Sequence, residues 1–198
     1  MRVLILLVLG LTVIAHAENA PGVIQQCASC HGPDGVSRWG DVPNISGLPE
    51  IVIANALYDF RGHARPCRNP ACGKEGTCPD MSMCQIAAPL TDGEMDVIAR
   101  YYAAKPFSPS VAEYDPEKAA LGAQIHDDYC EICHTGGGTD PEDEASILRG
   151  QNTEYISNAM SDYRSGVRLG EDAMLRKINK LSPEAVEALI HFYASPTD

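Results

Sequence analysis

The 198-residue sequence lacks any apolar run of the roughly 20 residues that a membrane-spanning helix needs. The one long apolar run covers residues 3–14, which is too short to span a bilayer. Arg2 precedes this run, and the Ala-His-Ala of residues 15–17 follows it, which is the pattern of a cleaved signal peptide. We therefore predict a signal peptide over residues 1–17, a periplasmic location, and a mature chain with no membrane span. The alternative is an uncleaved membrane anchor.

Basic residues are also scarce. The chain has 15 Lys and Arg residues against 27 Asp and Glu residues, for a net charge of −12, and loss of Arg2 with the signal peptide would make the charge one unit more negative. Such a surface repels nucleic acid and anionic membranes, so we expect no nucleic-acid partner. The charge fits a partner with a basic patch, and it fits equally well a surface that only keeps the protein in solution.

The alternating apolar pattern of β-strands is missing too. Residues 50–60 are apolar at helical spacing. Thr91 and Glu94 form a capping-box pattern that predicts a helix to about residue 104. Ser182 in the same way predicts a helix that ends near residue 195. The sequence therefore indicates an all-α protein.

Two halves of the sequence repeat one another. A shift of 103 residues aligns a CxxCH motif in each half and aligns residues 53–61 with 156–164. Further on the shift falls to 91, and Met83 then aligns with Met174. The difference is an insertion of 12 residues between Arg61 and Met83, and it is rich in cysteine. We infer an internal duplication of one helical unit.

The boundary between the halves is expected in residues 105–110, where two prolines interrupt any helix. The predicted domains cover residues 18–108, with the Cys-rich insertion, and residues 109–198. Each is small enough that side chains alone would form a marginal core. A large apolar cofactor at the centre would remedy this.

The repeated CxxCH motif predicts covalent haem. In this motif two thiols form thioether bonds to haem, and the next residue, a histidine, reaches the iron from the same side. A zinc site would need more ligands per domain, and a thioredoxin-type site would need a βαβ setting. We expect two covalently bound haem c groups, with the attachment residues and proximal ligands Cys27, Cys30 and His31, and Cys130, Cys133 and His134.

The sixth iron ligands are expected to be Met83 and Met174, because a thioether favours Fe(II) and both copies keep the same spacing to a following leucine. Met81 is the alternative in the first copy. Met160 aligns with Leu57 and is interpreted as a packing residue. The alternative for all these methionines is that they only fill the core.

The remaining cysteines are Cys67, Cys72, Cys78 and Cys84. In an exported chain they are expected to form two disulfides, with the pairing left open. The alternative is a thiolate site for Zn or Cu(I). Of the other residues, Trp39 is expected to pack near the first haem, and His126 to lie at the surface or to form a hydrogen bond.

The second half resembles the dihaem cytochrome c subunit of flavocytochrome c sulfide dehydrogenase. The resemblance covers residues 116–198 and is carried by residues 122–134, 159–164 and 192–195; it is looser over the first half, and the Cys-rich insertion departs from it. It implies two tandem class I cytochrome c domains that form a heterodimer with an FAD-containing flavoprotein. Electrons would pass from the flavoprotein through the haems to a soluble acceptor.

On this reading the chain transfers electrons and is not catalytic alone, and it carries no flavin or dinucleotide motif. The alternative is a free-standing dihaem carrier that delivers electrons to a terminal oxidase. A peroxidase would need an open iron site, and two methionine ligands argue against it.

Overall fold

The structure, a computed structural model, describes residues 20–197, so the predicted signal peptide lies outside the described residues. Within that range the regular elements are ten helices and no strands, which confirms the all-α prediction. No helix among residues 20–197 has the length and apolarity to cross a membrane. The helices are α1 (Ala20–His31), α2 (Glu50–Arg61), α3 (Ala71–Lys74), α4 (Met83–Ala87), α5 (Asp92–Ala103), α6 (Pro116–Tyr129), α7 (Thr135–Gly138), α8 (Thr153–Ser165), α9 (Asp172–Ile178) and α10 (Pro183–Ala194).

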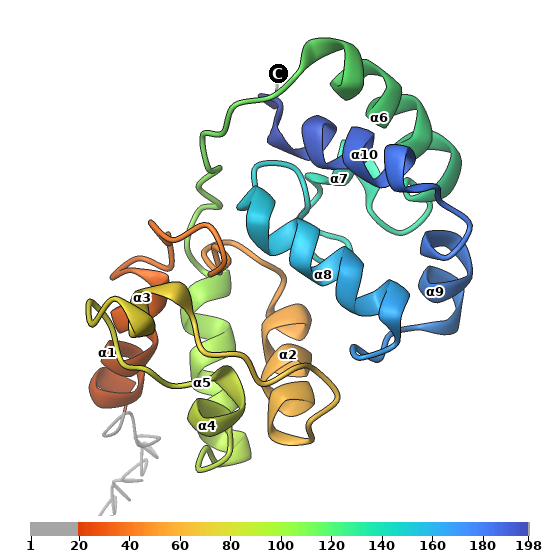
Figure 1. The fold of residues 1–198 in the computed structure, drawn as a ribbon. Coiled ribbons are helices and arrows are strands. Elements are labelled where there is room, and N and C mark those ends of the chain that lie inside the picture. The colour runs from red at the N-terminus through yellow and green to blue at the C-terminus, as the bar shows by residue number, and fades with distance from the viewer. Residues whose placement is uncertain (1–19, 198) are drawn as a thin grey trace, which may run out of the picture.

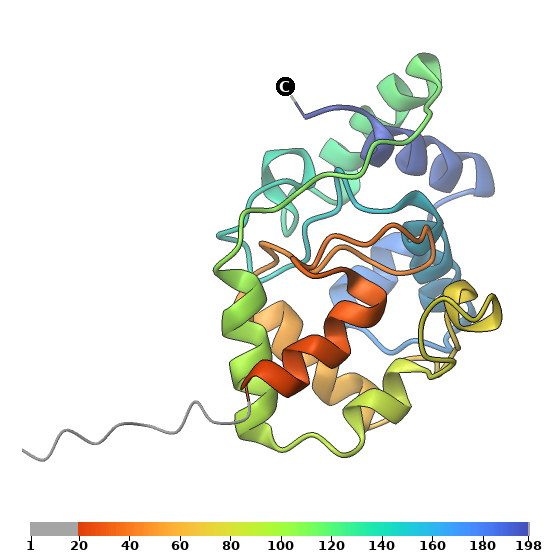
Figure 2. The ribbon, with the colours of Figure 1, turned by 90° about the vertical axis from the view of Figure 1, so that its left-hand side faces the viewer.

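The helices form two groups, α1–α5 and α6–α10, joined by an extended segment over residues 104–115 (Figure 1). In each group the first helix packs against the last, α1 against α5 and α6 against α10 (Figure 2). The middle helix of each group, α2 or α8, packs against the same last helix. The two groups therefore repeat one arrangement, as the shift of 103 residues predicts.

Each group has its own apolar core. In the first, α2 contributes Ile53 and Leu57, and α5 contributes Met95 and Ile98, all at most 6% exposed. In the second, α8 and α10 contribute the equivalent faces, made by Ile156, Met160, Leu189, Phe192 and Tyr193. These are the apolar faces that the helical spacing predicts, and the packing role of Met160 is confirmed.

The helix starts follow from local sequence. Thr91 and Glu94 form the predicted capping box at α5, and the Ser182 hydroxyl accepts a hydrogen bond from the Ala185 backbone N–H at α10. A capping box that the sequence analysis missed joins Ser82 and Gln85 and begins α4 at Met83. This cap fixes the backbone from which Met83 projects.

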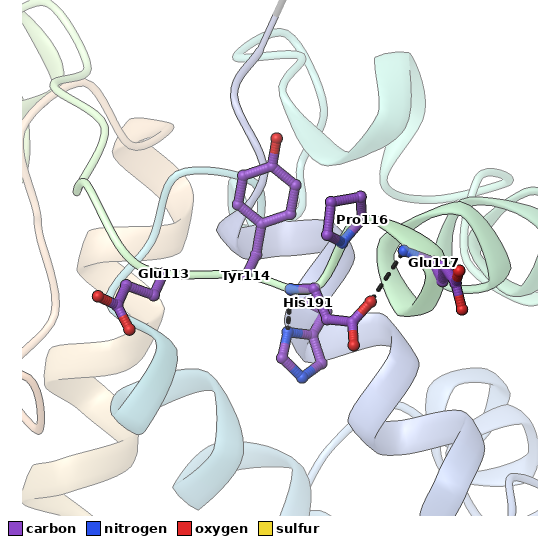
Figure 3. Close-up of a pocket in the computed structure, with 6 residues that line it drawn as sticks. Glu113, Tyr114, Pro116, Glu117 and His191 are labelled. Atoms are coloured by element: carbon purple, nitrogen blue, oxygen red, sulfur yellow. Dashed lines mark hydrogen bonds between the residues drawn. The ribbon is translucent and has the colours of Figure 1, made fainter.

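The start of α6 is tied to His191 of α10 by a backbone hydrogen bond (Figure 3). The Asp115 carboxylate accepts hydrogen bonds from the backbone N–H groups of Glu117 and Lys118, at 2.9 and 3.2 Å. The bond from Lys118 is the main cause that lowers the pKa of Asp115. The Asp115 backbone N–H donates to His191 Nδ1 of α10 at 3.0 Å. These residues line a shallow surface pocket, and the capping hydrogen bonds account for the arrangement of its polar groups.

Two glycines mark equivalent turns in the repeats. The backbone N–H of Gly47 donates to the carbonyl of Tyr102 at 2.9 Å, and that of Gly150 donates to the carbonyl of Tyr193 at 2.8 Å. Both glycines have positive φ, +66° and +83°, a backbone conformation that residues with a Cβ adopt only with strain. Residues of the linking segment pass so close that a Cβ at either glycine would collide with them.

A buried amide network joins the two domains. Gln151 accepts a hydrogen bond from the Asn44 backbone N–H at 2.7 Å and donates to the Asn44 carbonyl at 2.8 Å. Both side chains are at most 2% exposed. Asn152 donates to the carbonyl of Val42 across the same boundary at 2.6 Å. Because buried polar groups are costly unless paired, this network favours one orientation of the domains.

The crossing of α6 and α10 provides a stability test. A Cβ at Gly122 would lie 2.1 Å from the carbonyl oxygen of Ala188 and 2.6 Å from its carbonyl carbon. We expect Gly122→Ala to lower the free energy of unfolding by about 1–3 kcal/mol, the usual cost of overpacking, measured by urea denaturation. The matched control is Gly93→Ala in α5, where no atom lies within 4 Å of the new Cβ. Equal stability of the two variants would contradict the close helix crossing.

Candidate haem-binding sites

The two CxxCH motifs lie at equivalent helix ends. Cys27, Cys30 and His31 end α1, while Cys130 caps α6 and begins the second motif. A spacing of three residues in a helical turn brings two thiols to one side of the chain. None of the four motif thiols is in a disulfide. Burial raises the pKa of Cys27 to about 11, so this sulfur is uncharged at neutral pH.

The two motif histidines have the same hydrogen bond. His31 Nδ1 lies 2.9 Å from the carbonyl oxygen of Pro43, and His134 Nδ1 lies 2.9 Å from that of Ser146. A carbonyl can only accept, so each Nδ1 carries the proton and each Nε2 presents a lone pair. Burial also lowers the pKa of both histidines and favours the neutral ring. A metal-ligating histidine needs this tautomer and a hydrogen bond of this kind at the other ring nitrogen.

Both motifs open onto one continuous cavity of about 1450 Å³. Typical sites for a single small ligand measure roughly 300–1,000 Å³. The cavity walls include Cys27 and His31 of the first domain and Cys130 and His134 of the second. Its size and its two sets of S and N donors fit two haems, with Cys27, Cys30, His31, Cys130, Cys133 and His134 positioned to hold them.

The candidate axial methionines Met81, Met83 and Met174 all line this cavity. Met83 at the start of α4 and Met174 on α9 are both half-buried, and each packs against the core of its own domain. Met81 also lines the cavity but is 36% exposed and is not among the side chains packed on the core. This difference favours Met83 over Met81, and the axial roles of Met83 and Met174 stay predictions.

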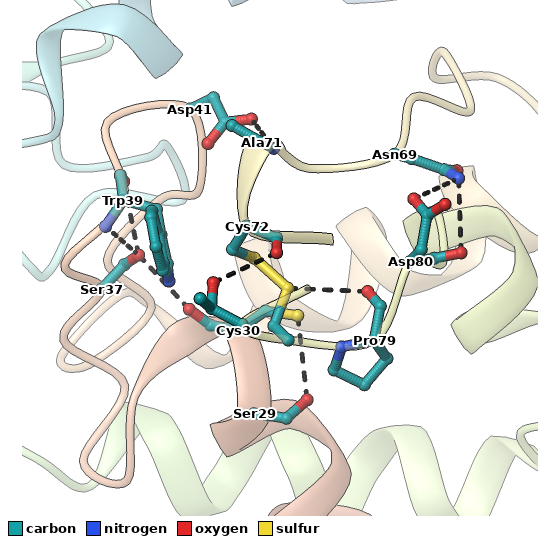
Figure 4. Close-up of a disulfide and its surroundings, with 12 residues drawn as sticks. Ser29, Cys30, Ser37, Trp39, Asp41, Asn69, Ala71, Cys72, Pro79 and Asp80 are labelled. Atoms are coloured by element: carbon teal, nitrogen blue, oxygen red, sulfur yellow. Dashed lines mark hydrogen bonds between the residues drawn. A yellow bond between two sulfur atoms is a disulfide. The ribbon is translucent and has the colours of Figure 1, made fainter. Parts of the chain in front are cut away.

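The Cys-rich insertion contains two disulfides, Cys67–Cys84 and Cys72–Cys78. The disulfide prediction is confirmed, and the alternative of a thiolate metal site is wrong because these sulfurs are bonded to one another. Cys84 directly follows Met83, so the first disulfide anchors the predicted axial residue. The second lies against the first motif, with the sulfurs of Cys30, Cys72 and Cys78 all within 4.8 Å of one another (Figure 4).

Trp39 is not among the residues of the cavity wall, and its packing near the first haem stays a prediction. The Arg38 guanidinium stacks on the Trp39 ring, 4.8 Å from the centroid, and the Trp39 carbonyl accepts a hydrogen bond from Asn152 at the domain junction. The expectation for His126 needs correction. His126 is not at the surface: it is fully buried and hydrogen-bonded to the Tyr193 hydroxyl at 2.9 Å. The hydrogen-bonding part of that expectation is confirmed. Its position next to the motif in sequence does not report the tertiary neighbours that bury His126.

The cavity wall also includes Arg65, Tyr155 and Arg168, which were not predicted from the sequence. A signal was present, because Arg65 aligns with Arg168 at the same shift of 103 residues as the CxxCH motifs. The aligned segments 53–61 and 156–164 end four residues before this pair of arginines.

Comparison with known proteins identifies the family. No protein-family model matches the chain. Cytochrome c4 of Stutzerimonas stutzeri is 30% identical over 202 residues, which cover 93% of each chain. The chain belongs to the cytochrome c4 family. A crystal structure of reduced recombinant cytochrome c4 from Pseudomonas stutzeri has a TM-score of 0.71 and 26% identity, and covers 90% of this chain and 97% of its own.

A second kind of relative is a thiosulfate dehydrogenase electron acceptor from Stutzerimonas stutzeri, 29% identical over 85% of this chain and 78% of its own. Membership of the cytochrome c4 family confirms the predictions of two tandem class I cytochrome c domains, two haem c groups and an electron-transfer function. These relatives support a dihaem cytochrome c. They do not confirm the more specific assignment to a sulfide dehydrogenase subunit.

Proposed function

We propose that this cytochrome c4 family member is an exported electron relay between a separate dehydrogenase and a soluble carrier. The observation that carries the proposal is the single cavity shared by the two CxxCH motifs. Cys27, Cys30 and His31 would hold one haem, and the motif that begins at Cys130 would hold the other. Haem c supplies one-electron chemistry through its Fe(II) and Fe(III) states.

The protein's own residues have three tasks in this scheme. The backbone carbonyls of Pro43 and Ser146 orient the proximal histidines. Met83 and Met174 would supply thioether ligands that raise the potentials. The amide network between Asn44 and Gln151 fixes the domains relative to each other, and with them the distance between the sites.

Export to the periplasm belongs to the same proposal. Two disulfides persist in oxidising compartments and are rare in the cytosol. The signal-peptide pattern of residues 1–17 supports the same location. The net charge of −12 suits an electron-transfer partner with a basic patch near its own redox centre.

For the electron donor we favour a dehydrogenase that oxidises thiosulfate, because a relative that spans 85% of this chain is a thiosulfate dehydrogenase electron acceptor. A flavoprotein sulfide dehydrogenase is the second candidate, supported by the resemblance of residues 122–134 and 159–164 to its cytochrome subunit. In either case FAD or another substrate-oxidising group would belong to the partner chain.

Reconstitution with each donor tests the proposal. The oxidised dihaem protein would be mixed with a thiosulfate dehydrogenase and thiosulfate, or with a sulfide-oxidising flavoprotein and sulfide, and haem reduction followed by absorbance. We expect rapid reduction with the first pair and none with thiosulfate alone. Rapid reduction only by the flavoprotein would favour the second candidate. Reduction by neither pair would leave the free-standing carrier to a terminal oxidase as the better reading.

A further inference from the structure

Two arginines at equivalent positions of the repeats meet in the shared cavity. Arg65 follows α2 and Arg168 follows α8, and both line the cavity. Arg65 is only 7% exposed. The backbone N–H of Leu169 donates to the carbonyl of Ala64 at 3.0 Å, so the two loops that carry the arginines are joined across the domain boundary (Figure 1).

The surroundings of the two guanidinium groups are also equivalent. Arg65 stacks on the ring of Phe60 at 4.5 Å, and Arg168 stacks on the ring of Tyr163 at 4.3 Å. Phe60 and Tyr163 are themselves 103 residues apart. Stacking on an aromatic face fixes the plane of a guanidinium and leaves its N–H edge free to bind an anion.

Both guanidinium groups interact with the Tyr155 hydroxyl. Arg65 Nη2 donates to the Tyr155 hydroxyl at 2.9 Å. Burial alone would raise the pKa of Tyr155, but the positive charges of Arg65 and Arg168 outweigh it and bring the pKa to about 8. The point where the two arginines converge is therefore strongly electropositive.

No carboxylate of the described part of the chain forms an ion pair with either guanidinium, although the charge of Asp59 contributes to the raised pKa of Arg168. Among residues 20–197, neither Arg65 nor Arg168 has a carboxylate within ion-pair distance. Arg168 Nε is buried and has no hydrogen-bond partner. The buried carboxylate nearby in sequence, Asp162, is already bound by both terminal nitrogens of Arg68. Because unpaired buried charge is costly, an anion is expected here.

A bound haem would carry such an anion, because the macrocycle has two propionate carboxylates. We propose that Arg65 and Arg168 form one cationic site between the two haems, which binds a propionate of each haem and raises both reduction potentials together. The inference rests on the proposed haem sites. Arginine suits the role because its planar fork binds a carboxylate with two hydrogen bonds. Positive charge at this point stabilises the reduced, less positive iron of either haem.

The test uses the dihaem protein with Arg65→Gln or Arg168→Gln, and spectroelectrochemistry resolves both haem potentials. We expect each variant to decrease the equilibrium constant for reduction of both haems by about tenfold, which corresponds to 59 mV for a one-electron couple. The matched control is Arg100→Gln, which removes the same charge from a side chain that is 58% exposed. We expect less than a twofold change in that control.

A shift confined to one haem, or shifts no larger than those of Arg100→Gln, would overturn the shared site. Arg168→Lys keeps the charge, so we expect both of its haem potentials to stay close to those of the wild-type protein. If it behaves like Arg168→Gln although its mass still includes two haems, the charge is not the cause and the inference is wrong. A wild-type protein without two covalent haems would instead overturn the proposed haem sites.

Discussion

Replacement of Met174 by alanine is expected to abolish the near-infrared sulfur-to-iron band of the second haem and to leave that of the first haem unchanged. Met83→Ala is expected to do the reverse. Axial ligands change haem potentials over a range of about 0.8 V, and a thioether lies on the high side. The potential of the affected haem should therefore fall by a large part of that range, while the other haem changes little.

Met81→Ala is the matched control for the first domain. Its side chain is 36% exposed and lies two residues from Met83 on the same cavity wall. We expect this variant to keep both sulfur-to-iron bands. Loss of the first band in Met81→Ala, with retention in Met83→Ala, would shift the ligand assignment by two residues.

Removal of the Cys67–Cys84 disulfide, by replacement of both cysteines with alanine, is the change with the second-largest expected effect. This bridge closes a loop with a sequence separation of 17 and joins the residue after Met83 to the segment that carries Arg65. Cys84 Sγ lies 3.8 Å from the Arg65 carbonyl oxygen. From loop-closure entropy we expect the free energy of unfolding to fall by about 3 kcal/mol. We also expect the first haem to lose its methionine ligand at a lower temperature.

The Cys72–Cys78 pair provides the control for this experiment. Its separation is only 6 residues, so the same entropy argument gives a smaller loss of about 2 kcal/mol. Its removal should not change the temperature at which the sulfur-to-iron band disappears. Equal lability of that band in both double variants would contradict a specific role of Cys67–Cys84 in holding Met83.

Local patterns in the sequence predict much of this fold. Residues 50–60 and the caps at Thr91 and Ser182 predict α2, α5 and α10 to within a residue or two, because helical periodicity and capping act over a few neighbouring residues. Gly47 and Gly150, which lie 103 residues apart in the sequence, have matching hydrogen bonds in the structure.

Contacts between distant segments could not be predicted in the same way. The pairing of Cys67 with Cys84 depends on where a long insertion folds back, and three pairings were compatible with the sequence. The hydrogen bonds between Asn44 and Gln151 join residues 107 positions apart, and neither residue belongs to a recognisable motif. The convergence of Arg65 and Arg168 depends on the orientation of the two domains, which no local pattern specifies.

The most direct test of the central claim, that each CxxCH motif holds a haem, is the intact mass of the protein purified from its native source and treated with acid-acetone. We expect the mature polypeptide plus two haems, and one haem fewer after Cys130→Ala with Cys133→Ala. The same loss is expected after Cys27→Ala with Cys30→Ala. Extraction of haem into the organic phase, with the mass of the bare polypeptide left behind, would contradict covalent attachment at these cysteines and with it the proposed electron relay.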